Sequence, residues 1–378
     1  MISRKILNVG KAMLSFLLLV APGLNTQAQG KPTLTIGDKV PELKYGQWLK
    51  GEPVTSYEKG RLYIFEFWAT WCGPCIASMP HLSEFAKEHK DKVSVIAVNI
   101  WEKTGDKPYE SSWPKVTRFV EQMGDKMGFA VMTDSKDEFM SHQWMKAAGQ
   151  SGIPCSFMVK DGIIQWIGHP IKLDSIVKVV SDEKYDVMAA REAAIKRSEN
   201  VDPNMESFSR IFKAYEDAVA AKQYKYALQI LDSGMTVNEN FNGTFGFFKF
   251  QLLLDHFKER KALAYAKKWQ KSRPGYVGST GAVIVNKPGL SKATYKYGIE
   301  LVQSLLENPN MPPSSVYEMM AKGYANMKDY KSAVEYQEKT VSSAREALKE
   351  GKFAGFILPD KVTEFETVLD EYKKKLKK

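Results

Sequence analysis

Two cysteines, Cys72 and Cys75, stand two residues apart at the end of the stretch FWATWCGPC. Thiols at this spacing can bind a metal, form a structural disulfide, or exchange disulfides with other thiols. The apolar run from Arg61 to Trp68 predicts a buried strand, and a helical pattern begins at the first cysteine. A helix N-terminus favours the thiolate, because its free N–H groups stabilise an anion. We therefore expect Cys72 to attack and Cys75, one helical turn on, to resolve a mixed disulfide.

The other two kinds of cysteine site fit the sequence less well. A structural zinc site commonly takes four Cys or His ligands in close pairs, whereas the five histidines are scattered and Cys155 is the one remaining cysteine. Ile76 stands where covalent haem attachment requires histidine. A disulfide across two residues closes too small a loop to stabilise a fold much. We expect no metal and no cofactor, and redox exchange is favoured over a purely structural disulfide.

The cysteine pair belongs to a segment in which short apolar runs alternate with helical patterns. The expected strands are 61–68, 92–100 and 127–134, and the expected helices are 75–90, 113–124, 137–149 and 173–182. Two apolar runs joined at Asp161 and Gly162 predict a hairpin over 154–168. This order predicts an α/β fold, with a central mixed sheet flanked by helices on both faces.

The strand signals fade after about Tyr185, and the rest of the chain is predicted to be helical. Segments 221–231 and 327–337 share the pattern Lys-x-Tyr-Lys-x-Ala. They resemble the tetratricopeptide helix–turn–helix repeat, in which Tyr324 and Ala333 would occupy packing positions. The spacing is irregular, so a degenerate repeat and a plain helical bundle both stay open. A Gly/Pro-rich stretch from Arg273 to Leu290 is expected to be a loop between helices.

The first 28 residues have the features of a secretory signal peptide. A basic start precedes the apolar run 12–21, and small residues follow near Ala28. This run is too short to span a bilayer, and no cysteine follows it that could carry a lipid anchor. No later segment is long and apolar enough for stable membrane insertion. We therefore expect residues 1–28 to be removed, leaving domains at 29–184 and 185–378 in an exported, periplasmic protein.

The net charge of +10 is unevenly distributed. Residues 29–184 carry 20 basic and 20 acidic side chains, whereas residues 185–378 carry 31 and 24. A nucleic-acid binder would cluster its basic residues with exposed aromatic ones. Here they are dispersed at helical spacing, apart from the last residues YKKKLKK. We therefore expect a solvated helical surface with a basic tail and no nucleic-acid partner.

The stretch FWATWCGPC closely resembles the active-site segment of the thioredoxins. Together with the export signal, it resembles the periplasmic TlpA-like and ResA-like thiol–disulfide oxidoreductases, over about residues 40–184. The resemblance implies a thioredoxin-like fold with Trp71, Gly73 and Pro74 completing the active-site motif. It also implies that the partners are protein thiols and disulfides, exchanged through Cys72 and Cys75.

The same resemblance implies roles for other residues. GIPC at 152–155 matches the family's loop with a cis-proline, so Pro154 is the expected cis residue and the backbone of Ile153 is expected to pair with substrate. Glu66 is the lone charge in an apolar strand and matches an acid that carries protons for the second cysteine; a structural pair with lysine is the alternative. Trp68 is expected to contribute to the docking surface. Cys155 departs from the usual threonine, and either an inert buried thiol or a resolving or regulatory one would fit.

The Gly-Pro pair between the cysteines resembles the reducing members of the family. We therefore expect a protein-disulfide reductase, which in an oxidising compartment requires electrons from a membrane-embedded donor. Two alternatives stay open. One is a redox adaptor that serves a single client, bound mainly by the helical domain. The other is a peroxidase of the peroxiredoxin type, although Ala69 stands where that family has Thr or Ser.

Overall fold

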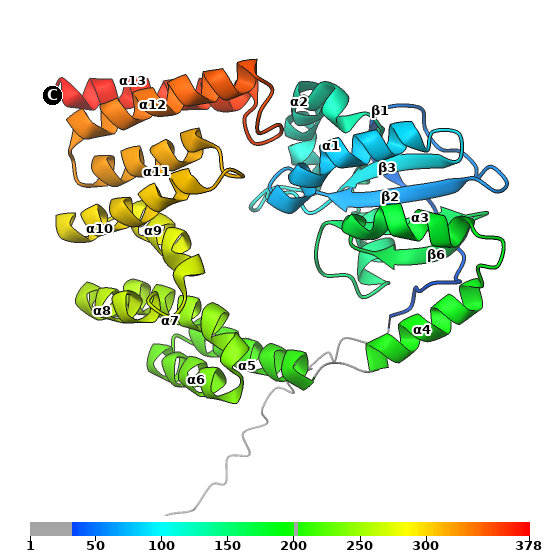
Figure 1. The fold of residues 1–378 in the computed structure, drawn as a ribbon, viewed down its shortest axis with the longest axis horizontal. Coiled ribbons are helices and arrows are strands. Elements are labelled where there is room, and N and C mark those ends of the chain that lie inside the picture. The colour runs from blue at the N-terminus through cyan, green and yellow to red at the C-terminus, as the bar shows by residue number, and fades with distance from the viewer. Residues whose placement is uncertain (1–31, 200–202) are drawn as a thin grey trace, which may run out of the picture.

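The structure is a computed structural model that describes residues 32–199 and 203–378. The expected signal peptide lies outside the described residues. The chain forms an α/β part and then a long series of helices, so the expected fold class is confirmed (Figure 1). Over the described ranges, no helix combines the length and the apolar character needed to cross a bilayer.

A six-stranded mixed sheet forms the centre of the α/β part. Its strands are β1 (Tyr45–Lys50), β2 (Leu62–Trp68), β3 (Val93–Asn99), β4 (Ala130–Asp134), β5 (Cys155–Lys160) and β6 (Ile163–Gly168). They lie in the order β1-β4-β3-β2-β5-β6, with β2, β3 and β4 parallel and the other pairings antiparallel. Strand β1 is missing from the sequence prediction, because this half-exposed edge strand has no continuous apolar run.

Both faces of the sheet are covered, which explains why every residue of β2 is buried. One face packs against α1 (Gly73–Glu88), α2 (Trp113–Met123) and α3 (Leu173–Ser181). The other face packs against a π-helical turn, η3 (Ser141–Lys146), within the expected helix 137–149. Trp144 of this turn lies 4.9 Å from Phe65 and 5.6 Å from Phe157, ring centre to ring centre.

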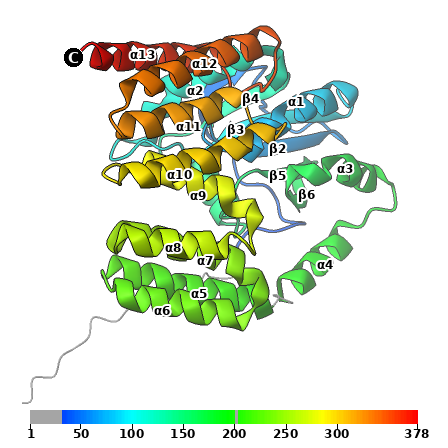
Figure 2. The same ribbon diagram turned by 60° about the vertical axis from the view of Figure 1, so that its left-hand side comes forward.

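Helix α4 (Val187–Glu199) leads from the sheet domain to the helical stack. The stack comprises α5 (Pro203–Ala220), α6 (Tyr224–Val237), α7 (Asn242–His256), α8 (Glu259–Trp269), α9 (Val277–Asn286), α10 (Lys292–Gln303), α11 (Pro313–Asn326), α12 (Tyr330–Lys349) and α13 (Pro359–Leu376). Consecutive helices of the stack pack on one another except α8 and α9, and α9 packs on α7 instead. The end of the stack that holds α12 and α13 returns to the side of α1 and α2 (Figures 1 and 2). Tyr324 stacks on Tyr336 and Ala333 is fully buried, while the tetratricopeptide assignment stays a prediction.

The expected loop from Arg273 to Leu290 is wrong, because most of it forms α9. The glycines that suggested a loop allow α9 and α10 to approach closely. A side-chain carbon at Gly281 would lie 2.8 Å from the carbonyl oxygen of Gly298 in α10. This close approach buries Ile284 and Val285, two apolar residues of α9, in the core of the stack.

Candidate active site

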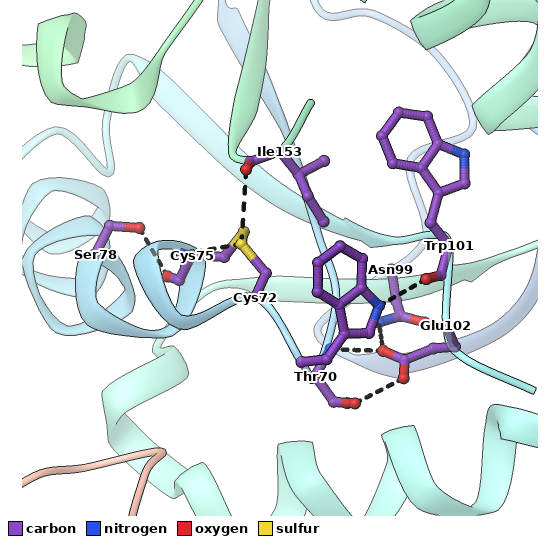
Figure 3. Close-up of a disulfide and its surroundings, with 9 residues drawn as sticks. Thr70, Cys72, Cys75, Ser78, Asn99, Trp101, Glu102 and Ile153 are labelled. Carbon is purple, nitrogen blue, oxygen red and sulfur yellow. Dashed lines mark hydrogen bonds between the residues drawn. A yellow bond between two sulfur atoms is a disulfide. The ribbon is translucent and has the colours of Figure 1, made fainter. Parts of the chain in front are cut away.

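The cysteine pair lies at the start of α1, directly after the central strand β2. Cys72 is the residue that caps α1, and its sulfur accepts a hydrogen bond from the backbone N–H of Cys75 at 3.2 Å. The two sulfurs form a disulfide, and both residues are buried (Figure 3). The first turn of α1 contains no acidic residue, so nothing there opposes the positive end of the helix. This position suits a sulfur that must carry negative charge.

The loop before β5 lies against the disulfide. The peptide bond between Ile153 and Pro154 is cis, and the carbonyl oxygen of Ile153 lies 3.7 Å from the sulfur of Cys72 (Figure 3). Pro154 is buried and Ile153 is partly exposed. The structure thus places backbone polar groups from residue 153 beside the cysteine that is expected to form mixed disulfides.

Glu66 lies on the same face of the sheet as the cysteines. Its neighbours along β2, Ile64 and Trp68, belong to the core that also contains Cys72 and Cys75. One oxygen of the Glu66 carboxyl accepts a hydrogen bond from the Ser156 hydroxyl, and the other has no hydrogen-bond partner among the described residues. Burial raises the pKa of Glu66 to about 8, against the opposing effect of the Ser156 hydrogen bond. No ion pair with lysine is found for Glu66 in the described chain, which disfavours the structural alternative.

Cys155 lies on the opposite face of the sheet. It packs in the core around Trp144 and Phe157, whereas the disulfide belongs to the core around α1. Burial raises the pKa of the Cys155 thiol to about 12, so the thiolate is strongly disfavoured. Position and ionisation both favour the inert thiol over the resolving one.

A buried carboxylate that the sequence analysis missed holds the segment before Cys72. Glu102 accepts hydrogen bonds from the backbone N–H and the hydroxyl of Thr70, at 2.5 and 2.6 Å, and from the side-chain amide of Asn99 at 3.0 Å (Figure 3). Lys115 approaches the same carboxylate at 3.4 Å. The signal was available in the sequence, because polar residues that follow neighbouring parallel strands meet at one edge of the sheet.

The two tryptophans near the cysteines have different environments. The indole N–H of Trp71 donates to the carbonyl oxygen of Trp101 at 2.7 Å, and the Lys103 ammonium lies over its ring. Trp71 remains 42% exposed, so it is available to a partner. The expected docking role of Trp68 is wrong, because its side chain is fully buried against Phe119 and no partner can contact it.

Two cavities flank the disulfide. One of about 510 Å³ begins at Pro74 and runs between α1 and the turn before α3, where His81 pairs with Asp174 at 3.2 Å. The other, of about 360 Å³, lies beside Pro154. His169 lines both and caps the turn before α3 through its Nδ1 atom. In the described part of the chain, no three His, Cys, Asp or Glu residues gather as metal ligands.

The raised pKa of Glu66 predicts a stability difference that depends on pH. Its pKa rises from about 4.5 to about 8 on folding, so between these values the folded protein holds a proton that the unfolded chain has released. Higher pH therefore favours unfolding in this window. Glu66→Gln should gain stability relative to the wild type as pH rises, by at most about 1.4 kcal/mol per pH unit.

Urea unfolding of the oxidised protein across that window measures the difference. Glu84→Gln, which changes an exposed carboxylate on α1, is the matched control and should follow the wild type. A gap between Glu66→Gln and wild type that stays constant with pH would contradict a buried, protonated Glu66.

Known proteins resemble part of this chain. The Redoxin family model matches residues 35–171. Protein FixW of Rhizobium leguminosarum is 27% identical over 213 residues, which covers 54% of this chain and 92% of FixW. The thiol-disulfide oxidoreductase ResA of Geobacillus thermodenitrificans is 28% identical over 168 residues, 42% of this chain and 85% of that protein.

The ResA protein of Bacillus thuringiensis gives a still higher identity. It is 30% identical over 147 residues, which covers 38% of this chain and 75% of ResA. The match with ResA thus spans most of that relative, and the Redoxin match at residues 35–171 includes both cysteines, the strand before them and the cis-proline loop. The chain therefore belongs to the ResA-like thiol–disulfide oxidoreductases of the thioredoxin superfamily.

Proposed function

We propose that the chain is an exported protein-disulfide reductase that acts through Cys72 and Cys75. One observation carries the proposal: the sulfur of Cys72 caps α1, bonds to Cys75 and lies 3.7 Å from the Ile153 carbonyl oxygen. A nucleophile, a resolving thiol and a backbone acceptor for an incoming chain are therefore together at one place. The ring of Trp71 contacts the Lys103 ammonium. The first turn of α1 is formed by Gly73 and Pro74. These contacts keep the two cysteines in position.

The reaction begins with both cysteines reduced. The Cys72 thiolate attacks one sulfur of a client disulfide, so that a bond between Cys72 and the client forms and the second client sulfur leaves as a thiolate that takes a proton from water. The Cys75 thiolate then attacks the Cys72 sulfur. This step releases the first client sulfur as a thiolate, which takes a proton from water, and restores the disulfide between Cys72 and Cys75. Two electrons pass from the protein to the client, and a dithiol donor must return them.

Glu66 is proposed as the group that takes the proton from Cys75 before the second attack. Its position on the α1 face and its pKa of about 8 support this role. A carboxyl with this pKa is mostly protonated at neutral pH but partly ionised, so its ionised fraction can accept a proton and its protonated form can return one. One oxygen of the carboxyl is already fixed by Ser156, and the other has no partner among the residues described. That second oxygen is the one available to a proton relay.

Ile153 is proposed as the backbone contact for the client. Its carbonyl oxygen faces Cys72 at the mouth of the site, and the cavity beside Pro154 leaves room along this loop. An extended client segment bonded to Cys72 can then donate an N–H to residue 153, as an added strand does.

We also propose that the protein works in the periplasm. Removal of residues 1–28 would leave a sheet domain that ends near residue 184, between α3 and α4, and a helical domain beyond it. In an oxidising periplasm the electrons must come from the cytoplasm, so we propose a membrane-embedded dithiol donor as the second partner.

Cys75→Ser should trap clients on Cys72, because the mixed disulfide can no longer be resolved. Expressed in the native compartment and quenched with acid, the variant should yield adducts that mass spectrometry identifies as exported proteins. Cys72→Ser is the matched control and should yield none. Absence of adducts with Cys75→Ser would overturn the exchange mechanism, and adducts confined to cytoplasmic proteins would overturn the proposed location. A single dominant client would favour the adaptor alternative.

Loss of the carboxylate should slow the resolving step. We expect Glu66→Gln to prolong the mixed disulfide at neutral pH by about a hundredfold, the size of a typical general-base contribution. Quenched-flow alkylation of the reduced protein mixed with a disulfide peptide measures the lifetime of the adduct. The difference should shrink at high pH, where Cys75 ionises without help. An unchanged lifetime would remove Glu66 from the proton path.

The proposed direction of electron flow predicts a low reduction potential. Equilibration of the Cys72–Cys75 pair with dithiothreitol should give a value nearer to the about −270 mV of thioredoxin than to the about −120 mV of the oxidant DsbA. A potential near the latter would show that the protein is an oxidase.

A further inference from the structure

The helical domain touches the sheet domain beside the disulfide, through the loop between α12 and α13 (residues 350–358, the α12–α13 loop). Figures 1 and 2 both show the α12–α13 end of the stack next to α1 and α2. The carbonyl oxygen of Gly351 accepts a hydrogen bond from the Lys126 ammonium at 2.8 Å. Arg118 of α2 pairs with Asp360, just beyond the loop, at 3.2 Å.

The centre of the loop contacts the sheet domain closely enough to require glycine. Gly355 has a φ of +80°, and a side-chain carbon there would lie 2.2 Å from Ile76 Cγ2 in α1. On either side of this contact the loop is anchored in both domains. Phe353 and Ile357 pack in the core around α12 and α13, and Leu358 packs against the core that contains the disulfide. The loop is therefore held in place from both domains.

Phe356 is a large apolar side chain of this loop that stays accessible. It is 40% exposed, and its ring lies 3.7 Å from the position that a side-chain carbon on Gly73 would occupy. Gly73 has no side chain, so the ring faces the backbone of the residue that follows Cys72. Cys72 thus lies between Trp71, itself exposed, and a glycine that faces a second exposed aromatic ring from the other domain.

A client bonded to Cys72 can extend over this surface. Consecutive residues of a client are about 3.8 Å apart, the same spacing that separates Cys72 from Gly73, so a residue next to the client's reacting cysteine can lie over Gly73 and the ring beside it. Burial of an apolar client side chain against Phe356 removes both from water, whereas a small polar side chain gains little from the contact.

We propose that Phe356 is a specificity-determining residue: the helical domain uses it to select client disulfides that have an apolar residue next to the reacting cysteine. This inference rests on the proposed function, since it requires that Cys72 form mixed disulfides with proteins. The helical domain would then contact the client directly, next to the disulfide that is being reduced.

The test compares two disulfide peptides that differ in one residue. The peptides carry Phe or Ser next to the cysteine, and each is mixed with the full-length, pre-reduced protein under single-turnover conditions. Alkylation and mass spectrometry give the rate constant for formation of the Cys72–Cys75 disulfide. The wild type should prefer the Phe peptide. Phe356→Ala should lower the ratio of the two rate constants by about fivefold, the usual effect of removing one significant interface side chain.

Two further variants separate recognition from structure. Phe356→Leu keeps an apolar surface and should retain most of the preference. Tyr226→Ala removes an exposed aromatic ring from α6, far from α1 in Figure 1, and should retain all of it. An unchanged ratio in Phe356→Ala, or equal rates for both peptides in the wild type, would overturn the inference while leaving the reductase intact. A wild type that reduces neither peptide would overturn the proposed function, and the inference with it.

Discussion

The hydrogen bond between the sulfur of Cys72 and the backbone N–H of Cys75 sets the position of everything else at the site. It exists because β2 ends and α1 begins within a few residues, so the first sulfur takes the place of an ordinary capping oxygen. The buried strand fixes the start of the helix, and Glu102 fixes the residues between strand and helix through Thr70. A reactive sulfur at a helix end is useful only if that end is held still, and these contacts hold it.

The sheet also positions the loop before β5 beside the cysteines. Strand β5 pairs with β2, so the loop that leads into β5 is brought to the same edge of the sheet as the cysteines. The carbonyl group of Ile153 and the hydroxyl of Ser156 both come from this neighbouring segment, one beside Cys72 and the other on Glu66. One antiparallel pairing, that of β5 with β2, therefore positions both the proposed docking group and the proposed proton carrier.

Local patterns predicted much of this arrangement. The apolar run of β2 and the helical spacing of α1 were sufficient to place Cys72 at a helix start, and the family resemblance placed Pro154. Features that depend on distant contacts were not predictable in this way. The docking role expected for Trp68 came from the family resemblance, whereas the apolar run 61–68 itself predicts a buried strand, and the structure agrees with the apolar run. The glycines of α9 indicated a loop because their role, close approach to α10, depends on a helix that follows in the chain. The approach of the Phe356 ring to Gly73 brings together residues almost three hundred positions apart, and no local signal marks it.

The location of Cys155 has a consequence for how the chain matures. Three cysteines allow three different pairings, and only one of them gives the disulfide seen here. Because Cys155 points into the core on the far side of the sheet, the fully packed β2 and β5 stand between it and the other two sulfurs. Once the sheet has formed, the wrong pairings are blocked by a layer of backbone and side chains. Oxidation of the folded chain is therefore expected to join Cys72 to Cys75 and to leave Cys155 as a thiol.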